Sequence, residues 1–98
     1  MNRVFLQLWE ESERGWGVRP DGCSLHIDNN ELDRYVEDIY KDRGDNIPNE
    51  YERTIGGSIE AFIDNELFTK VSTNKNVRIS QNSLNNLILM NELIIKNP

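Results

Sequence analysis

Cysteine, positive charge and long apolar runs are all scarce in this chain, and each shortage excludes a class of protein. Cys23 is the only cysteine, which excludes an intramolecular disulfide and a metal site built on two cysteines. The longest apolar run, residues 87–90, is far shorter than the roughly 20 residues that cross a bilayer. The first residues also lack the apolar segment of a secretory signal. We therefore expect a soluble, cytoplasmic protein without membrane contact.

Basic residues are outnumbered, 11 against 17 acidic ones, so the chain carries a net charge of -6. Proteins that bind nucleic acid directly rely on Lys and Arg to displace counterions from phosphate groups. We therefore expect no direct nucleic-acid ligand. Acidity of this size keeps a small protein soluble, and it is also compatible with a basic protein partner or with mimicry of a polyanion.

Three stretches alternate in hydrophobicity with the period of two that is typical of strands: residues 3–10, 23–27 and 58–64. The connection over 11–22 is too long for a tight two-residue turn. Because no helix fits between the first two strands, we expect them to pair antiparallel. The segment 45–57 contains Pro48 and two adjacent glycines, which predicts an irregular, partly extended connection.

Residues 28–44 carry the clearest helix signal. Asp28 is a favourable N-cap, and Glu31 stands where a reciprocal capping bond would place it. The apolar residues between them and Gly44 recur every three or four positions and form one stripe, and Gly44 favours the end of the helix. Asp64 likewise precedes a shorter helical pattern.

The last third of the chain repeats this arrangement. Residues 77–88 superpose without a gap on 25–36, which predicts a strand, a cap at Ser80 and a helix over 81–90. Beyond it we expect a short final strand, with a hairpin over 87–96 as the alternative.

Together these elements predict a single α+β domain over residues 1–98. We expect a small mixed or antiparallel sheet of four to five strands, with two to three helices mainly on one face. The second face would carry Phe5, Trp9, His26 and Phe62, whereas a solvated sheet face normally alternates to polar residues. Loops of the chain, a second copy in a homodimer or a target protein would then cover it.

Catalytic and metal-binding patterns are missing from the sequence. His26 is the only histidine, and acid–base or metal chemistry would require partners for it. Cys23 lies in a predicted strand, where a small core residue is the ordinary interpretation. No spacing groups a nucleophile, a base and an orienting residue. We therefore expect no enzyme, no cofactor and no metal.

The remaining signal is one of recognition. Residue types that anchor protein interfaces gather in two places: Arg14, Trp16, Arg19 and Asp21 in the connection over 11–22, and Tyr51 and Arg53 further along. Trp16 stands between two glycines, and two placements are open. Either it folds back over Tyr35 or the sheet, or it faces a partner. Beside Arg14 and Arg19 it would alternatively suit a nucleotide-like ligand.

The stretch "ERGWGVRPDGCSLHI", followed later by "IPNEYER", is similar to small proteins encoded by bacteriophages and prophages, for which no activity is assigned. The resemblance covers residues 9–67 and depends on the "GWG", "RPDG" and "SLH" motifs. It supplies no functional residue. It implies a phage setting and the cytoplasm of a host cell, where small acidic proteins inhibit host defences, as anti-CRISPR proteins do.

The leading hypothesis is a phage binding protein that occupies a host defence protein, such as a nucleic-acid-binding effector, sterically or as a DNA mimic. Acidic side chains of the first helix would meet a basic groove: Asp33, Glu37, Asp38 and Asp42. Trp16 would add an apolar anchor. The alternatives are a protein that sequesters a nucleotide signal and a structural or self-assembling domain.

Overall fold

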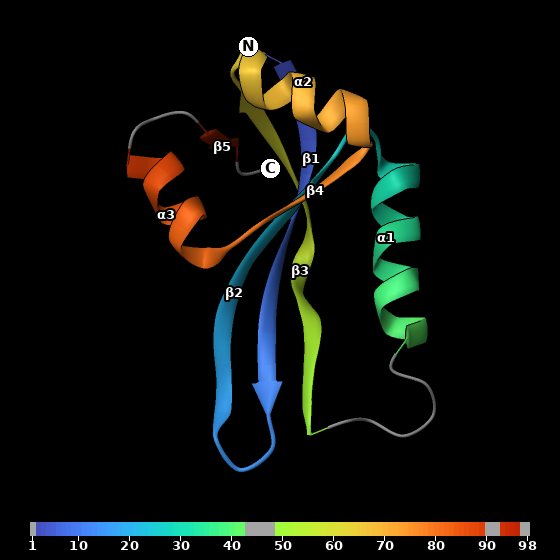
Figure 1. Ribbon diagram of the computed structural model, residues 1–98, viewed down its shortest axis with the longest axis vertical. Coiled ribbons are helices and arrows are strands. Elements are labelled where there is room, and N and C mark those ends of the chain that lie inside the picture. The colour runs from blue at the N-terminus through green and yellow to red at the C-terminus, as the bar shows by residue number, and fades with distance from the viewer. Residues whose placement is uncertain (1, 43–48, 90–92, 97–98) are drawn as a thin grey trace.

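The computed structural model describes residues 2–42, 49–89 and 93–96. The elements follow in the order β1 (Asn2–Glu13), β2 (Gly17–His26), α1 (Asn29–Asp42), β3 (Glu50–Ile63), α2 (Asn65–Asn74), β4 (Asn76–Ile79), α3 (Gln81–Leu89) and β5 (Leu93–Lys96). The five strands form one antiparallel sheet in the order β4-β2-β1-β3-β5 (Figure 1). The predicted α+β class is confirmed, and the alternative hairpin over 87–96 is wrong because helix α3 runs to Leu89.

The same hydrogen bond starts all three of these helices. A side-chain oxygen of the residue before the helix accepts the backbone N–H three positions later, which satisfies a donor that the first turn leaves unpaired: Asp28 from Glu31 at 2.8 Å, Asp64 from Leu67 at 2.8 Å, and Ser80 from Ser83 at 3.2 Å. The three predicted caps are therefore confirmed. The predicted helix end at Gly44 lies outside the described residues.

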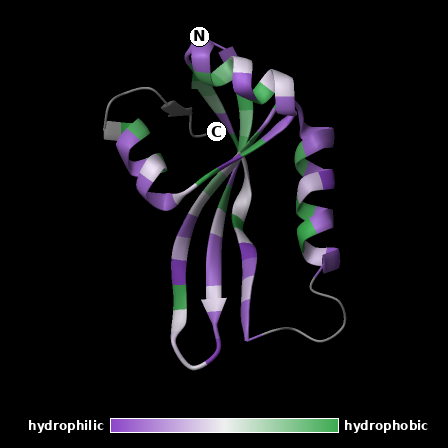
Figure 2. Cartoon of the chain, in the orientation of Figure 1, coloured by the Kyte–Doolittle hydropathy of each residue, from purple (hydrophilic) through white to green (hydrophobic). Residues whose placement is uncertain are grey.

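Helices α2 and α3 cover one face of the sheet, where the main core lies. The buried cluster joins alternate residues of the strands to one residue from each helix, Val71 of α2 and Leu84 of α3. Cys23 is fully buried in this cluster, as predicted. Figure 2 shows hydrophobic residues gathered in the part of the sheet that the helices flank, whereas the end near the β1–β2 turn is mostly hydrophilic.

Helix α1 covers the other face. The sequence had predicted loops, a second copy or a target protein in this place, so that prediction is wrong for Trp9. Trp9 and His26 are fully buried there. The ring of Trp9 makes edge contacts with Tyr35 at 6.0 Å and Tyr40 at 6.4 Å, and the ring of His26 lies 5.1 Å from Tyr35. The tyrosines belong to the same apolar stripe that predicted α1. Loops, a second copy or a target are therefore not needed to cover Trp9.

Strands β1 and β2 are longer than predicted, and the expected long connection over 11–22 is wrong. β1 continues to Glu13 and β2 begins at Gly17, so only residues 14–16 form the turn. The N–H of Trp16 donates to the Glu13 carbonyl at 3.0 Å. Gly15 and Gly17 have φ angles of 85° and 94°, values that glycine adopts without strain. The two glycines around Trp16 are thus the residues that let the chain reverse.

Strand β3 begins at Glu50, so the expectation of an irregular connection is wrong for residues 50–57. The two adjacent glycines lie in a bulge instead, since the pairing of β1 with β3 shifts between Leu6 and Leu8. The side-chain amide of Gln7 donates to the carbonyls of Ile55 at 3.3 Å and Gly56 at 3.1 Å. Gln7 therefore satisfies backbone acceptors at the bulge.

None of the helices within the described ranges combines the length and the apolarity that crossing a bilayer requires.

Candidate functional site

Trp16 lies at the tip of the β1–β2 hairpin, and its side chain is 84% exposed. The hairpin tip lies at the opposite end of the sheet from α2 (Figure 1). The backbone N–H of Arg14 donates to the Asn49 carbonyl at 2.8 Å, which ties the turn to the chain before β3. Trp16 faces solvent, so the placement folded back over Tyr35 or the sheet is wrong, and contact with a partner stays a prediction.

Three strands carry this tip, and we call their ends, together with the turn, the arm: residues 10–13 of β1, 14–16 of the turn, 17–21 of β2 and 50–55 of β3. Two patches predicted separately from the sequence meet here, because Tyr51 pairs with Ser12 and Arg53 with Glu10 across β1 and β3. The arm also exposes apolar side chains, with Val18 at 48% and Ile55 at 38%. Arg14, Trp16, Arg19, Tyr51 and Arg53 therefore belong to one surface region.

Charges on the arm are arranged in cross-strand pairs. Arg19 donates to Glu11 at 3.2 Å, and Arg53 forms an ion pair with Glu10. The carboxylates of Glu11, Glu13 and Glu50 lie within 4.8 Å of one another at the base of the turn. Because Arg19 pairs with only one of these three groups, the arm is locally negative beneath Trp16.

One position on each outer edge of the arm cannot donate a backbone hydrogen bond to a neighbouring strand. Pro20 on β2 has no N–H, and it is exposed. On β3, the N–H of Thr54 already donates to the Tyr40 hydroxyl at 3.0 Å. Native sheets use such devices to prevent edge-to-edge pairing. Contacts made by the arm are therefore expected to use side chains.

Asp21 lies at the base of the arm and has a structural partner. Arg78 of β4 donates to Glu52 at 2.5 Å, to the Asp21 carboxylate at 3.3 Å and to its carbonyl at 2.8 Å. The guanidinium lies 5.1 Å from the centre of the Trp9 ring. Burial, followed by the hydrogen bond with Asp21, raises the pKa of Glu52. Arg78 thus connects three strands over the buried indole.

A buried hydrogen-bond chain connects Trp9 with α1. The indole N–H donates to the Ser24 hydroxyl at 2.8 Å, and that hydroxyl lies 2.6 Å from Nε2 of His26. Nδ1 of His26 lies 2.6 Å from the side-chain oxygen of Asn76, whose amide donates to Glu31 at 3.3 Å. The side-chain oxygen of Asn76 only accepts, so Nδ1–H of His26 donates to it. In the neutral imidazole Nε2 then accepts from the Ser24 hydroxyl, which itself accepts from the indole N–H. With His26 neutral, each of these side chains has a hydrogen-bond partner.

These hydrogen bonds bring together a serine, a histidine and an asparagine amide. The spacing of the three residues in the sequence did not reveal this grouping. Ser24 and His26 share a face of β2 two residues apart, and that spacing was the available signal, but Asn76 comes from β4. Ser24 and His26 are both fully buried, so a substrate has no access to the pair. Burial also raises the pKa of the Cys23 thiol to about 12, which keeps it protonated. Cys23 packs in the core on one face of β2, and Ser24 and His26 form buried hydrogen bonds on the other face.

His26 makes folding dependent on pH. Its burial lowers the pKa of the imidazole below the ordinary value of about 6.5. The unfolded chain therefore takes up a proton first as the pH falls, so the contribution is complete above pH 6.5 and declines below it, by up to about 1.4 kcal/mol per pH unit. Urea unfolding at pH 7.5 and 5.5 should show this loss for the wild type and a smaller one for His26→Gln. Parallel losses in both proteins would contradict the assignment.

The acidic residues of α1 lie on a separate surface. Glu37 and Asp38 are exposed, as are Asp33 and Asp42. Helix α1 runs beside β3 in Figure 1, and a groove between them is lined partly by Glu37 and Thr54. Of the predicted contact residues, Glu37 and Asp38 are thus the two that lie outside the arm.

Comparison with protein-family models, curated proteins and solved structures finds no match to this chain. The resemblance to phage proteins therefore stays a prediction.

Proposed function

We propose that this protein is a non-enzymatic, phage-type binding protein that inhibits a host antiviral defence protein by occupying its surface. The observation that carries the proposal is the exposure of Trp16 at the tip of a hairpin. A tryptophan is among the residues most enriched at energetically dominant interface positions. Trp16 contributes little to the core, so its contacts are available to a partner.

The arm supports a defined mode of contact. Trp16 would insert into an apolar pocket of the partner, with the exposed side chains of Val18 and Ile55 as further apolar contacts. The carboxylates of Glu11, Glu13 and Glu50 lie close together at the base of the turn and favour basic residues on the partner's rim. Pro20 has no N–H and the N–H of Thr54 already donates to the Tyr40 hydroxyl. The partner would therefore be recognised through side chains.

If the protein acts as a DNA mimic, the contact surface would be helix α1. Its exposed carboxylates would replace phosphate groups in a basic groove of the target, so binding should weaken steeply as salt increases. We expect Glu37→Lys with Asp38→Lys to reduce affinity at least about tenfold at low salt, measured by titration against the captured partner. Glu66→Lys, an exposed charge on α2, is the control and should bind normally. Salt-independent binding would exclude mimicry and leave steric occupation through the arm.

Two alternatives are less well supported. A nucleotide held by Trp16, Arg14 and Arg19 would meet the carboxylate of Glu11, which already pairs with Arg19. Calorimetric titration with cyclic nucleotides tests it, and measurable heat would favour it. Self-assembly would be favoured if a second copy covered Phe5, Trp9 and Phe62, but α1 of the same chain already covers Trp9. Sedimentation at several concentrations tests for a homodimer.

A further inference from the structure

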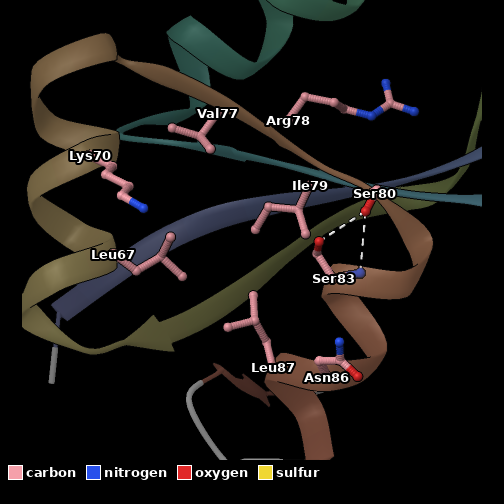
Figure 3. Close-up of a pocket in the computed structure, with 9 residues that line it drawn as sticks. All are labelled: Leu67, Lys70, Val77, Arg78, Ile79, Ser80, Ser83, Asn86 and Leu87. Carbon is pink, nitrogen blue, oxygen red and sulfur yellow. Dashed lines mark hydrogen bonds between the residues drawn. The ribbon is translucent and has the colours of Figure 1, made fainter.

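A pocket of about 560 Å³ lies between α2, β4 and α3, on the face of the sheet opposite α1 (Figure 3). Its size falls within the range of small-molecule sites, about 300–1,000 Å³. None of the residues that line it belongs to the arm or to the acidic surface of α1. The proposed function therefore leaves this pocket unexplained.

Apolar side chains from three elements form its wall: Leu67 of α2, Val77 and Ile79 of β4, and Leu87 of α3. Ile79 belongs to the buried core, and the other three pack against that core while remaining partly exposed. The pocket is thus an opening onto the core between two helices. Apolar surface of this kind is stabilised when a ligand removes it from water.

Polar residues line the rest of the pocket: Lys70 of α2, Arg78 of β4, Ser80, and Ser83 and Asn86 of α3. Figure 3 shows the ammonium group of Lys70 directed from α2 toward the cavity, with Asn86 on α3 beside Leu87. Among the residues that the structure describes, no carboxylate lies within ion-pair distance of Lys70. Arg78 also lines the pocket, but its guanidinium is paired with Glu52 and Asp21. The ammonium of Lys70 beside the apolar wall therefore favours an anionic head group.

We propose that this pocket binds a small amphipathic monoanion, namely an alkyl carboxylate of medium chain length. The alkyl chain would lie along Leu67, Val77, Ile79 and Leu87. The carboxylate would accept hydrogen bonds from the ammonium of Lys70 and the side-chain amide of Asn86. One ammonium group matches one carboxylate, since Lys acts as a compact point charge. The site is independent of the contact surface on the arm.

Sodium decanoate and the uncharged decanol are the probes, each titrated into the ¹⁵N-labelled full chain and followed by amide chemical shifts. Decanoate is expected to shift the amides of Leu67, Val77, Ile79 and Leu87 and to bind more tightly than decanol. Lys70→Met keeps most of the side-chain stem and removes the charge, so it should weaken decanoate at least tenfold and leave decanol unchanged.

Lys41→Met, an exposed lysine on α1, is the matched control and should bind decanoate normally. The amide spectrum of each variant reports whether it is folded. The proposal is overturned if decanoate shifts none of these amides. It is also overturned if decanol binds as tightly as decanoate and Lys70→Met leaves both affinities unchanged.

Discussion

Replacing Trp16 by alanine is expected to abolish capture of the partner from a lysate of the bacterial host. The indole is 84% exposed at the tip of the arm, so its removal deletes the largest available contact. Truncation of such an anchor costs about 2 kcal/mol or more, which is about a 30-fold loss of affinity. The measurement is a parallel pull-down with both proteins, followed by titration of the band that the variant loses.

The same substitution should leave folding unchanged. Exposed side chains away from caps and networks change stability by about 0.5 kcal/mol or less, so the urea midpoints of Trp16→Ala and wild type should coincide. Glu66→Ala, at an exposed position of α2, is the binding control. Capture that survives in Trp16→Ala would mean that the partner is bound elsewhere on the molecule.

Replacing the other tryptophan is expected to have the opposite effect. Trp9→Ala removes a fully buried indole, together with its ring contacts to Tyr35 and Tyr40 and its hydrogen bond to Ser24. Large-to-small changes of this kind cost about 3–5 kcal/mol. That is a large part of the about 5–15 kcal/mol that stabilises a typical domain. Urea unfolding of Trp9→Ala against wild type gives the number.

Trp9→Phe separates packing from the hydrogen bond, since phenylalanine keeps an aromatic ring and loses the N–H. It should destabilise the protein less than Trp9→Ala and remain folded by circular dichroism. Trp16→Ala serves as the exposed tryptophan control. A Trp9→Ala protein within about 1 kcal/mol of wild type would contradict the assignment of Trp9 to the core beneath α1.

The helix starts were predictable because their causes are local. Asp28, Asp64 and Ser80 each accept a hydrogen bond from the N–H three residues later. Such a bond depends only on the residue types at that spacing. The apolar stripe of α1 was equally visible, but the sequence did not show that Tyr35 packs on the second face of the sheet. Which face a helix covers depends on the path of the whole chain.

The arm was not predictable from alternation. Residues 10–13 and 17–22 are polar at most positions, so two solvated faces produce no period of two. The adjacent glycines before Ser58 indicated a break, whereas the buried amide of Gln7 donates to carbonyls at the bulge and strand β3 continues through it. The first error comes from solvated faces without a hydrophobic period, and the second comes from backbone carbonyls satisfied by a side chain of another strand.

The candidate site was therefore predicted in its residues and not in its geometry. Trp16, Tyr51 and Arg53 were selected by residue type, and the pairing of β1 with β2 and β3 brings them onto one arm. Asp21 was selected for the same reason, yet Arg78 binds its carboxylate. Composition identified candidates, and strand register decided which of them share a surface.

Trp16 accessibility tests the central claim most directly. In Trp9→Phe the only indole is Trp16, so acrylamide quenching of its fluorescence reports on this side chain alone. The account predicts strong quenching in the free protein and protection when the captured partner is added. An indole already shielded in the free protein, or one quenched equally in the complex, would contradict it.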